Sequence, residues 1–368
     1  MSKLFAPITL AGLTLPNRIV VAPMCQYSAV NGQAQDWHVQ HYGAMAASGP
    51  GMIVLEATGV APEGRISPNC LGLYDDATEA ALTGLVRKLK SFGHSAIAVQ
   101  LAHAGRKGST APAWEGGGPT GNWTNVAPSA EPFDAGWPVP QALDEAGLER
   151  LRQAFAGAAQ RALRVGFDAI EVHSAHGYLL HQFLSPLANK RTDSYGGSLE
   201  NRMRFPLEVI KAARAAWPQG KPLGIRISAT DWLEGGLTLE ESEVYAKAFA
   251  TTGIDYVCVS SGGVVAKAPI PVGPGYQVHL AETIRKASGL PTRAVGLIAT
   301  PELAEQVVAE GKADMVAIGR GFLDNPRWVW HAAEKLGVDF PVANQYARAT
   351  ARTWPGARMA RPQAEAAE

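Results

Sequence analysis

The feature that most constrains this sequence is a regular alternation of short apolar runs with longer amphipathic segments. Eight runs rich in Val and Ile are typical of buried strands, because their apolar residues are nearly continuous and turn residues bound them. They lie at 19–22, 52–55, 96–101, 169–173, 223–227, 256–260, 292–295 and 315–318. Helical periodicity is predicted at 37–47, 76–92, 144–165, 199–217, 239–252, 277–288, 301–310 and 326–336. Eight β-then-α units without a break in composition predict a single (β/α)₈ TIM barrel of the α/β class, covering residues 1–368.

Four further segments are added to this predicted barrel. Residues 8–10 and 13–15 flank Ala11-Gly12 as the strands of a hairpin would, and we expect this hairpin to plug the bottom of the barrel. Long connections follow the third strand (104–140) and the fourth (174–198), where loops of a barrel tend to cover the active site. The C-terminal tail, from about 341 to 368, is predicted to be irregular.

Charge and cysteine content narrow the classes of partner. Thirty-three basic residues balance thirty-three acidic ones, so no net field favours nucleic acid or an anionic membrane, and a small molecule is the expected partner. No export signal and no apolar run of about 18 residues is present, so no membrane span is expected. The three cysteines fit neither a disulfide framework nor a Cys-x-x-Cys metal site, which predicts a reducing, cytoplasmic location.

Strand parity predicts which side chains point into the barrel. The bulky residues of three predicted strands share one face, which leaves Gln100, His173 and Arg226 on the inner face near the strand ends. Their small neighbours Ala98 and Gly224 leave room for a large flat ligand. An inward arginine needs an anion or several acceptors, so Arg226 either contacts such a ligand or pairs with the inward Glu171.

The fourth strand ends in a cluster of polar aromatic residues, His173, His176 and Tyr178. A turn brings residues three apart together, so the two imidazoles can share one oxygen atom of a ligand. A metal pair is the weaker interpretation, because no further ligand set completes it, and two structural histidines are the plain alternative. Tyr178 is either a hydroxyl donor or an aromatic wall of the site.

The ends of the last two strands predict a phosphate site. Gly296 follows the seventh strand, and Gly319 and Arg320 follow the eighth, where backbone amides of barrels commonly hold phosphate. Together they point to a phosphorylated cofactor such as FMN. Cys25, after the first strand, is either a small core residue or a contact to that cofactor; we interpret Cys70 and Cys258 as core residues.

Longer motifs carry a resemblance to a known family. The run from Asn189 to Arg202 (NKRTDSYGGSLENR), the run from Gln100 to Arg106 (QLAHAGR) and the His173, His176, Tyr178 set are similar to the Old Yellow Enzyme family, in its thermophilic-like branch. The resemblance implies roles for each matching position. Flavin-ring contacts would be Pro23, Met24, Cys25, Ala57, Gln100 and Arg226; phosphate contacts Gly296, Gly319 and Arg320; and substrate contacts His173, His176, Tyr178 as proton donor, Tyr27, and Arg348 lent by a neighbouring subunit.

The same resemblance implies the activity. It would be an FMN-dependent ene-reductase that takes hydride from NADPH or NADH and reduces enones, maleimides and nitroalkenes by a ping-pong cycle, as a homodimer or homotetramer. Two positions depart from the family pattern: Val295 stands where one member has a tryptophan, and Trp354 competes with Arg348 in a divergent tail. A flavin-free barrel lyase or aldolase and a non-catalytic flavin carrier are the alternatives.

Overall fold

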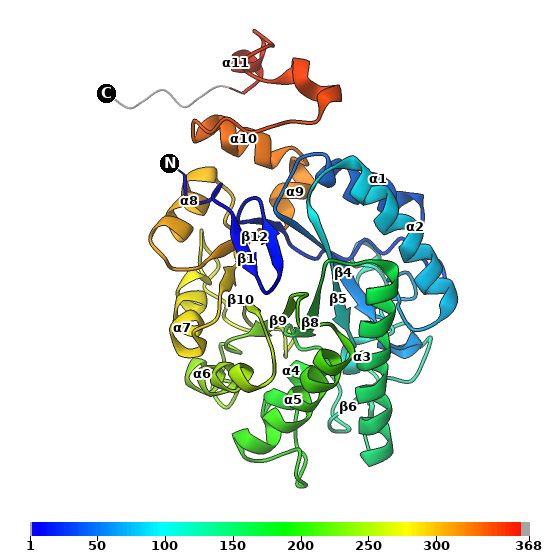
Figure 1. Ribbon diagram of the computed structural model, residues 1–368. Coiled ribbons are helices and arrows are strands. Elements are labelled where there is room, and N and C mark those ends of the chain that lie inside the picture. The colour runs from blue at the N-terminus through cyan, green and yellow to red at the C-terminus, as the bar shows by residue number, and fades with distance from the viewer. Residues whose placement is uncertain (1, 362–368) are drawn as a thin grey trace.

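Eight parallel strands close into a barrel in this computed structural model, which describes residues 2–361. Each strand pairs with the next one along the chain, and the last pairs with the first (Figure 1). The predicted barrel is therefore confirmed, with its second to fifth strands longer than the sequence indicated. The strands are β3 (Ile19–Val21), β4 (Met52–Gly59), β5 (Ala96–Ala102), β8 (Ala169–Ser174), β9 (Leu223–Ser228), β10 (Tyr256–Ser260), β11 (Thr292–Ala294) and β12 (Met315–Ile318).

All eight predicted helical segments are present around the barrel. Two of them begin at capping hydroxyl groups: the Ser198 hydroxyl accepts the N–H of Asn201 (3.3 Å), and the Thr300 hydroxyl accepts the N–H of Leu303 (3.2 Å). The helices are α1 (Asp36–Ala46), α2 (Asp76–Phe92), α3 (Glu145–Val165), α5 (Leu199–Ala216), α6 (Leu239–Ala248), α7 (Val278–Ser288), α8 (Pro301–Ala309) and α10 (Trp328–Lys335).

Outside the tail, two short helices were not predicted from the sequence. One is α4 (Leu179–Leu184), inside the connection after β8, and the other is α9 (Arg320–Asp324), directly after β12. All six residues of α4 are buried, so the helix has no polar face and its sequence shows no helical period. A buried helix, rather than an open loop, therefore follows the end of the fourth barrel strand.

The two faces of each strand pack in different places. Ile97, Val99 and Leu101 belong to the large cluster between the barrel and its helices, whereas Ala98 belongs to a smaller cluster inside the barrel. The same parity holds along β8, where Ala169 lies inside and Ile170 outside. This confirms the predicted strand parity, and it places residues of the Ala98–Gln100 and Ala169–Glu171–His173 series on the inner face.

The N-terminal hairpin closes one end of the barrel. Its strands β1 (Ile8–Leu10) and β2 (Leu13–Leu15) pair antiparallel, as predicted. Leu10 and Leu15 are buried in the inner cluster, in the company of Met315 from β12. Figure 1 shows the blue hairpin lying across the barrel strands. The interior is thus sealed by apolar side chains at this end, and ligands have to approach from the other.

The long connections carry structure of their own. The one after β5 forms 3₁₀ turns at Gly105–Lys107 and Ala113–Glu115 and a small sheet of β6 (Val126–Ala127) and β7 (Gln141–Ala142). The tail, predicted as irregular, forms a 3₁₀ segment at Asn344–Ala349 and α11 (Ala357–Ala360), and its end, 362–368, lies outside the described residues. Within 2–361, every helix is too short or too polar to cross a membrane.

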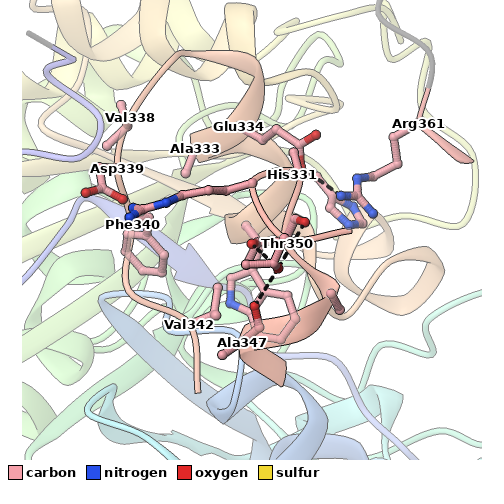
Figure 2. A pocket seen from close by; sticks show the side chains of 15 residues that line it. His331, Ala333, Glu334, Val338, Asp339, Phe340, Val342, Ala347, Thr350 and Arg361 are labelled. Carbon is pink, nitrogen blue, oxygen red and sulfur yellow. Dashed lines mark hydrogen bonds and ion pairs between the residues drawn. The ribbon is translucent and has the colours of Figure 1, made fainter. Parts of the chain in front are cut away.

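The tail packs on α10 and leaves a cleft of about 380 Å³ beside it. Figure 2 shows His331 and Glu334 of α10 on one side of this cleft and Thr350 of the tail facing them. Arg361 donates to the Glu334 carboxylate at 2.9 Å, and the Trp330 and Tyr346 rings lie 5.3 Å apart. These contacts fix the tail to the outer layer of the barrel.

Candidate active site

The inward polar residues of neighbouring strands meet at the carboxyl ends of the barrel. Gln100 of β5 lies opposite Glu171 of β8, and His173 of β8 lies opposite Arg226 of β9. All four side chains are buried. The space beside Gly224 is filled by the Tyr256 ring, which would lie 2.1 Å from a Cβ at that position, so the prediction that Gly224 leaves room for a ligand is wrong. The parity prediction for Gln100, His173 and Arg226 therefore describes one shared interior space.

The partner of Glu171 is Arg293 of β11, not Arg226. The Arg293 guanidinium forms a fully buried ion pair with the Glu171 carboxylate, which also accepts a hydrogen bond from the Gln100 amide (2.8 Å). Within the described residues no bond joins Arg226 to Glu171, so that interpretation of Arg226 is wrong. A charged residue in a predicted buried strand was the signal available for Arg293. A carboxylate only accepts, so Gln100 turns its NH₂ to Glu171 and its oxygen away from it.

Arg226 instead lines a cavity of about 370 Å³ at the ends of β3, β9, β11 and β12. Its Nε is buried without a hydrogen-bond partner among the described residues, and Arg320 lines the same cavity. Two guanidinium groups at one cavity suit a ligand with a phosphate or several acceptor atoms. The cavity brings together six of the predicted cofactor residues, together with Val295: Pro23, Met24, Arg226, Gly296, Gly319 and Arg320.

The backbone of this cavity is shaped by Gly296, whose φ of +119° suits glycine. A Cβ at Gly296 would lie 2.8 Å from the Gln277 amide nitrogen, so the wall is packed closely behind it. The donor set, the unpartnered Arg226 Nε and the close backbone approach together fit FMN, with its phosphate and its acceptor-rich ring edge.

The predicted aromatic cluster forms at the end of β8. The rings of His173 and His176 lie 5.2 Å apart, and those of His173 and Tyr178 lie 5.0 Å apart. His173 Nδ1 accepts the N–H of Ala175 (3.2 Å), so its proton lies on Nε2. His176 Nε2 lies 2.8 Å from the Ser260 hydroxyl. The three side chains are thus adjacent, as the motif predicted.

Burial sets the protonation of this cluster. It lowers the pKa of both His173 and His176 well below the usual value, with the charge of Arg226 as the next cause. Burial also raises the pKa of Tyr178 well above the usual value for a phenol. At neutral pH the site therefore holds two neutral imidazoles and a protonated phenol, all of which can donate hydrogen bonds.

Lys107 holds the loop that carries this cluster, and the sequence reasoning missed it. Its Nζ donates to the carbonyl oxygens of His176 (2.8 Å) and Gly263 (2.9 Å) and lies 5.1 Å from the centre of the Tyr178 ring. Burial and then the charge of Arg106 lower the pKa of Lys107 to about 8. The one signal for Lys107 in the sequence was its position directly after the family motif that runs from Gln100 to Arg106.

The remaining predicted residues fall into two places. Cys25, Tyr27 and Tyr178 pack around one small apolar cluster that contains Ala57. Tyr27 also meets Trp114 of the connection after β5, with ring centres 5.4 Å apart, so this connection does reach the site. Arg348 is exposed in the tail that packs on α10, and within this one chain it is not brought into the cluster.

Comparisons with known proteins agree with this geometry. The model of the NADH:flavin oxidoreductase / NADH oxidase family matches residues 3–338. An NADPH dehydrogenase of Geobacillus thermodenitrificans is 48% identical over 94% of this chain and 98% of its own length. An NADH:flavin oxidoreductase of Gibberella zeae is 44% identical over 94% of this chain and 88% of its own.

Solved structures give the same result. Morphinone reductase is 29% identical, with a TM-score of 0.76 over 92% of this chain and 91% of its own. A 2-naphthoyl-CoA reductase is 28% identical, with a TM-score of 0.83 over 90% of this chain and 52% of its own. The flavin-free lyase alternative is thereby removed. The chain belongs to the NADH:flavin oxidoreductase / NADH oxidase family, within the Old Yellow Enzyme group, as an oxidoreductase with FMN as cofactor and a nicotinamide as hydride donor.

Proposed function

We propose that this protein is an ene-reductase that reduces the activated carbon–carbon double bonds of enones, maleimides and nitroalkenes. The observation that carries the proposal is the group of neutral donors at the end of β8, with His173 within 5.2 Å of His176 and 5.0 Å of Tyr178. FMN, when bound, supplies the transfer of hydride from NADPH or NADH to the substrate. The chain's own residues bind, orient and protonate that substrate.

The cofactor would be held by two sets of residues. Gly296, Gly319 and Arg320 would bind its phosphate, because they line a cavity that two guanidinium groups make positive. The second set would contact the flavin ring, where Arg226 offers its unpartnered Nε and Gln100 the amide oxygen that it turns away from Glu171. This set comprises Pro23, Met24, Cys25, Ala57, Gln100 and Arg226.

The substrate would be activated by hydrogen bonds and then protonated. His173 and His176 would donate to the carbonyl or nitro oxygen, where negative charge builds as hydride reaches the β carbon. Tyr178 would give its phenolic proton to the α carbon, and its raised pKa keeps that proton in place until the carbanion forms. Tyr27 would border the substrate from the other side.

We also propose that the chain works as a homodimer or homotetramer in which the tail lends Arg348 to a neighbouring site. The tail is anchored on α10, and it exposes both Arg348 and Trp354. Trp354 is the competing candidate for the same role.

The test is anaerobic reduction of the enzyme with NADPH, followed by addition of cyclohexenone or a maleimide. An ene-reductase regains the spectrum of oxidised flavin and forms one saturated product per flavin, whereas saturated cyclohexanone leaves the flavin reduced. A flavin carrier would bind FMN and stay reduced with both compounds. Initial rates should give parallel double-reciprocal lines, since nicotinamide leaves before the substrate binds; intersecting lines would contradict the ping-pong order.

A further inference from the structure

Two thiols and a carboxylate from three separate segments converge beside the candidate active site. The Sγ atoms of Cys25 and Cys70 and a carboxylate oxygen of Glu56 all lie within 4.8 Å of one another. Glu56 and Cys70 are completely buried, and Cys25 is half-buried at the place where the flavin ring would contact it. Cys25 follows β3, Glu56 lies in β4, and Cys70 lies in the loop after the 3₁₀ turn Pro62–Gly64.

A bulge in β4 aims the carboxylate at this point. The pairing register between β4 and β5 shifts between Leu55 and Ala57, so Glu56 is the extra residue of the strand. Bulges next to active sites commonly redirect one side chain in this way. The Glu56 carboxylate accepts the N–H of Gln26 at 3.0 Å, which fixes it against the segment that carries Cys25.

The charge of Glu56 is not balanced by the residues around it. Within 2–361, His38 is the one Lys, Arg or His side chain with a nitrogen within 4.0 Å of the Glu56 carboxylate, and its Nε2 lies 3.3 Å from it. His38 Nδ1 accepts the N–H of Gln35 (3.0 Å), so the proton lies on Nε2 and the ring is neutral. A buried carboxylate with only neutral partners is costly, and a bound cation would offset that cost.

We propose that Cys25, Glu56 and Cys70 form a binding site for a soft divalent cation, Zn²⁺ or Cd²⁺. Two thiolates and one carboxylate are the ligand types that Zn²⁺ selects, and three protein ligands leave a fourth position open. Binding forms two metal–sulfur bonds and releases the two thiol protons to solvent, with no change of oxidation state. Metal–ligand bonds of about 2.0–2.3 Å require the three groups to close in only modestly from their present separation.

Metal binding at this site would depend on pH and would affect residues near the catalytic groups. A thiol binds a metal as the thiolate, so binding at Cys25 and Cys70 releases their protons. Affinity therefore rises with pH. Cys25 packs against the same apolar cluster as Tyr27 and Tyr178. A metal bound to Cys25 would therefore restrain the cluster against which Tyr27, the proposed border of the substrate, also packs.

The test is titration of the metal-free holoenzyme with CdCl₂ in the absence of thiol reductants. We expect one Cd²⁺ per chain by equilibrium dialysis, together with the ultraviolet charge-transfer band of a cadmium–thiolate bond. Cys70→Ser should bind at least about tenfold more weakly with a smaller band, and Glu56→Gln should bind more weakly and keep its band. Cys258→Ser is the matched control, because it removes a buried thiol of β10 outside this group and should leave binding unchanged.

Either of two results would overturn the proposal: no saturable Cd²⁺ on the wild-type holoenzyme, or Cys70→Ser and Glu56→Gln that both bind as the wild type does. FMN content and the unfolding midpoint verify that each variant is folded. If Cys70→Ser does not fold, Glu56→Gln alone decides, since its side chain keeps the size of the original. None of these measurements uses enone reduction, so the cation site can fail while the proposed function stands, and the reverse.

Discussion

At the scale of single residues, the site separates fixed positive charge from neutral hydrogen-bond donors. Arg226 carries the charge, and its presence near His173 and His176 helps to lower the pKa of both rings. The imidazoles therefore stay neutral at pH 7. Each neutral ring still carries one N–H that can donate a hydrogen bond to a substrate oxygen. Tyr178, held protonated by burial, completes the set.

The two kinds of donor are expected to differ in how much kcat/KM falls when each is removed. We expect His173→Ala with His176→Ala to lose more kcat/KM for cyclohexenone than Tyr178→Phe, because solvent can replace a proton donor but not two aimed hydrogen bonds. The individual effects overlap, at about 10²–10³ per oxyanion donor and about 10²–10⁴ for an acid. The measurement compares both variants at equal FMN content, and a larger loss in Tyr178→Phe would reverse the ranking.

At the scale of elements, the connection after β8 is held in place by its close approach to the connection after β10. Gly177 and Gly263 both have positive φ (+71° and +95°), and a Cβ at Gly177 would lie 2.1 Å from the Gly263 carbonyl oxygen. Lys107 spans the same contact, with hydrogen bonds to one carbonyl oxygen of each connection. The position of the histidine cluster is thus set by backbone packing between two loops.

Gly177→Ala tests this packing, with Gly197→Ala as its control. Both positions have left-handed backbone, φ +71° and +79°, but a Cβ at Gly197 would meet nothing within 4 Å. Gly197→Ala should therefore cost only about 1–2 kcal/mol for the backbone conformation. Gly177→Ala should cost more by urea denaturation and should also lower kcat/KM; equal losses in the two variants would show that the loop contact does not matter.

At the scale of the whole molecule, buried neutral histidines link stability to pH. Burial lowers the pKa of His41 and of His103 to about 4 each, below the unfolded value of about 6.5. Between these values the unfolded chain binds the proton and the folded chain does not. The free energy of unfolding therefore falls as pH falls from about 6.5 to 4, by about 1.4 kcal/mol per pH unit for each such histidine.

His103→Gln should make this dependence shallower. Urea denaturation at several pH values from 7 to 4.5 measures the slope, which should decrease by about 1.4 kcal/mol per pH unit when one histidine is removed. His94→Gln is the control, because His94 is exposed and its removal should leave the slope unchanged. Equal slopes in wild type and His103→Gln would contradict the argument.

The proposed exchange of Arg348 between subunits can be tested by mixing two inactive chains. A chain with Arg348→Ala and a chain with His173→Ala and His176→Ala each lack one contribution to every site. If Arg348 serves the neighbouring subunit, co-expression yields oligomers with some complete sites and activity above the sum of the two parents. Activity equal to that sum, with mixed oligomers present by mass, would assign the role elsewhere, and Trp354→Ala is then the next variant.

The sequence by itself determined the barrel and the direction of its inner side chains. Runs of continuous apolar residues mark buried strands, and the two-residue period of a strand places Gln100, His173 and Arg226 on the inner face. It missed α4, because a helix buried on every side has no period to detect. Local patterns of this kind carry the fold class and the motif positions.

Tertiary structure alone decided which distant residues meet. Glu171 forms its ion pair with Arg293 and not with Arg226. Cys25 and Cys70 lie next to the carboxylate of Glu56, the residue at the bulge in β4. Such pairings depend on strand stagger, barrel closure and loop packing, each of which sums many contacts between residues far apart in the sequence. The periodicity of a sequence predicts the face on which a side chain lies. It does not predict which residue from a distant strand or loop that side chain contacts.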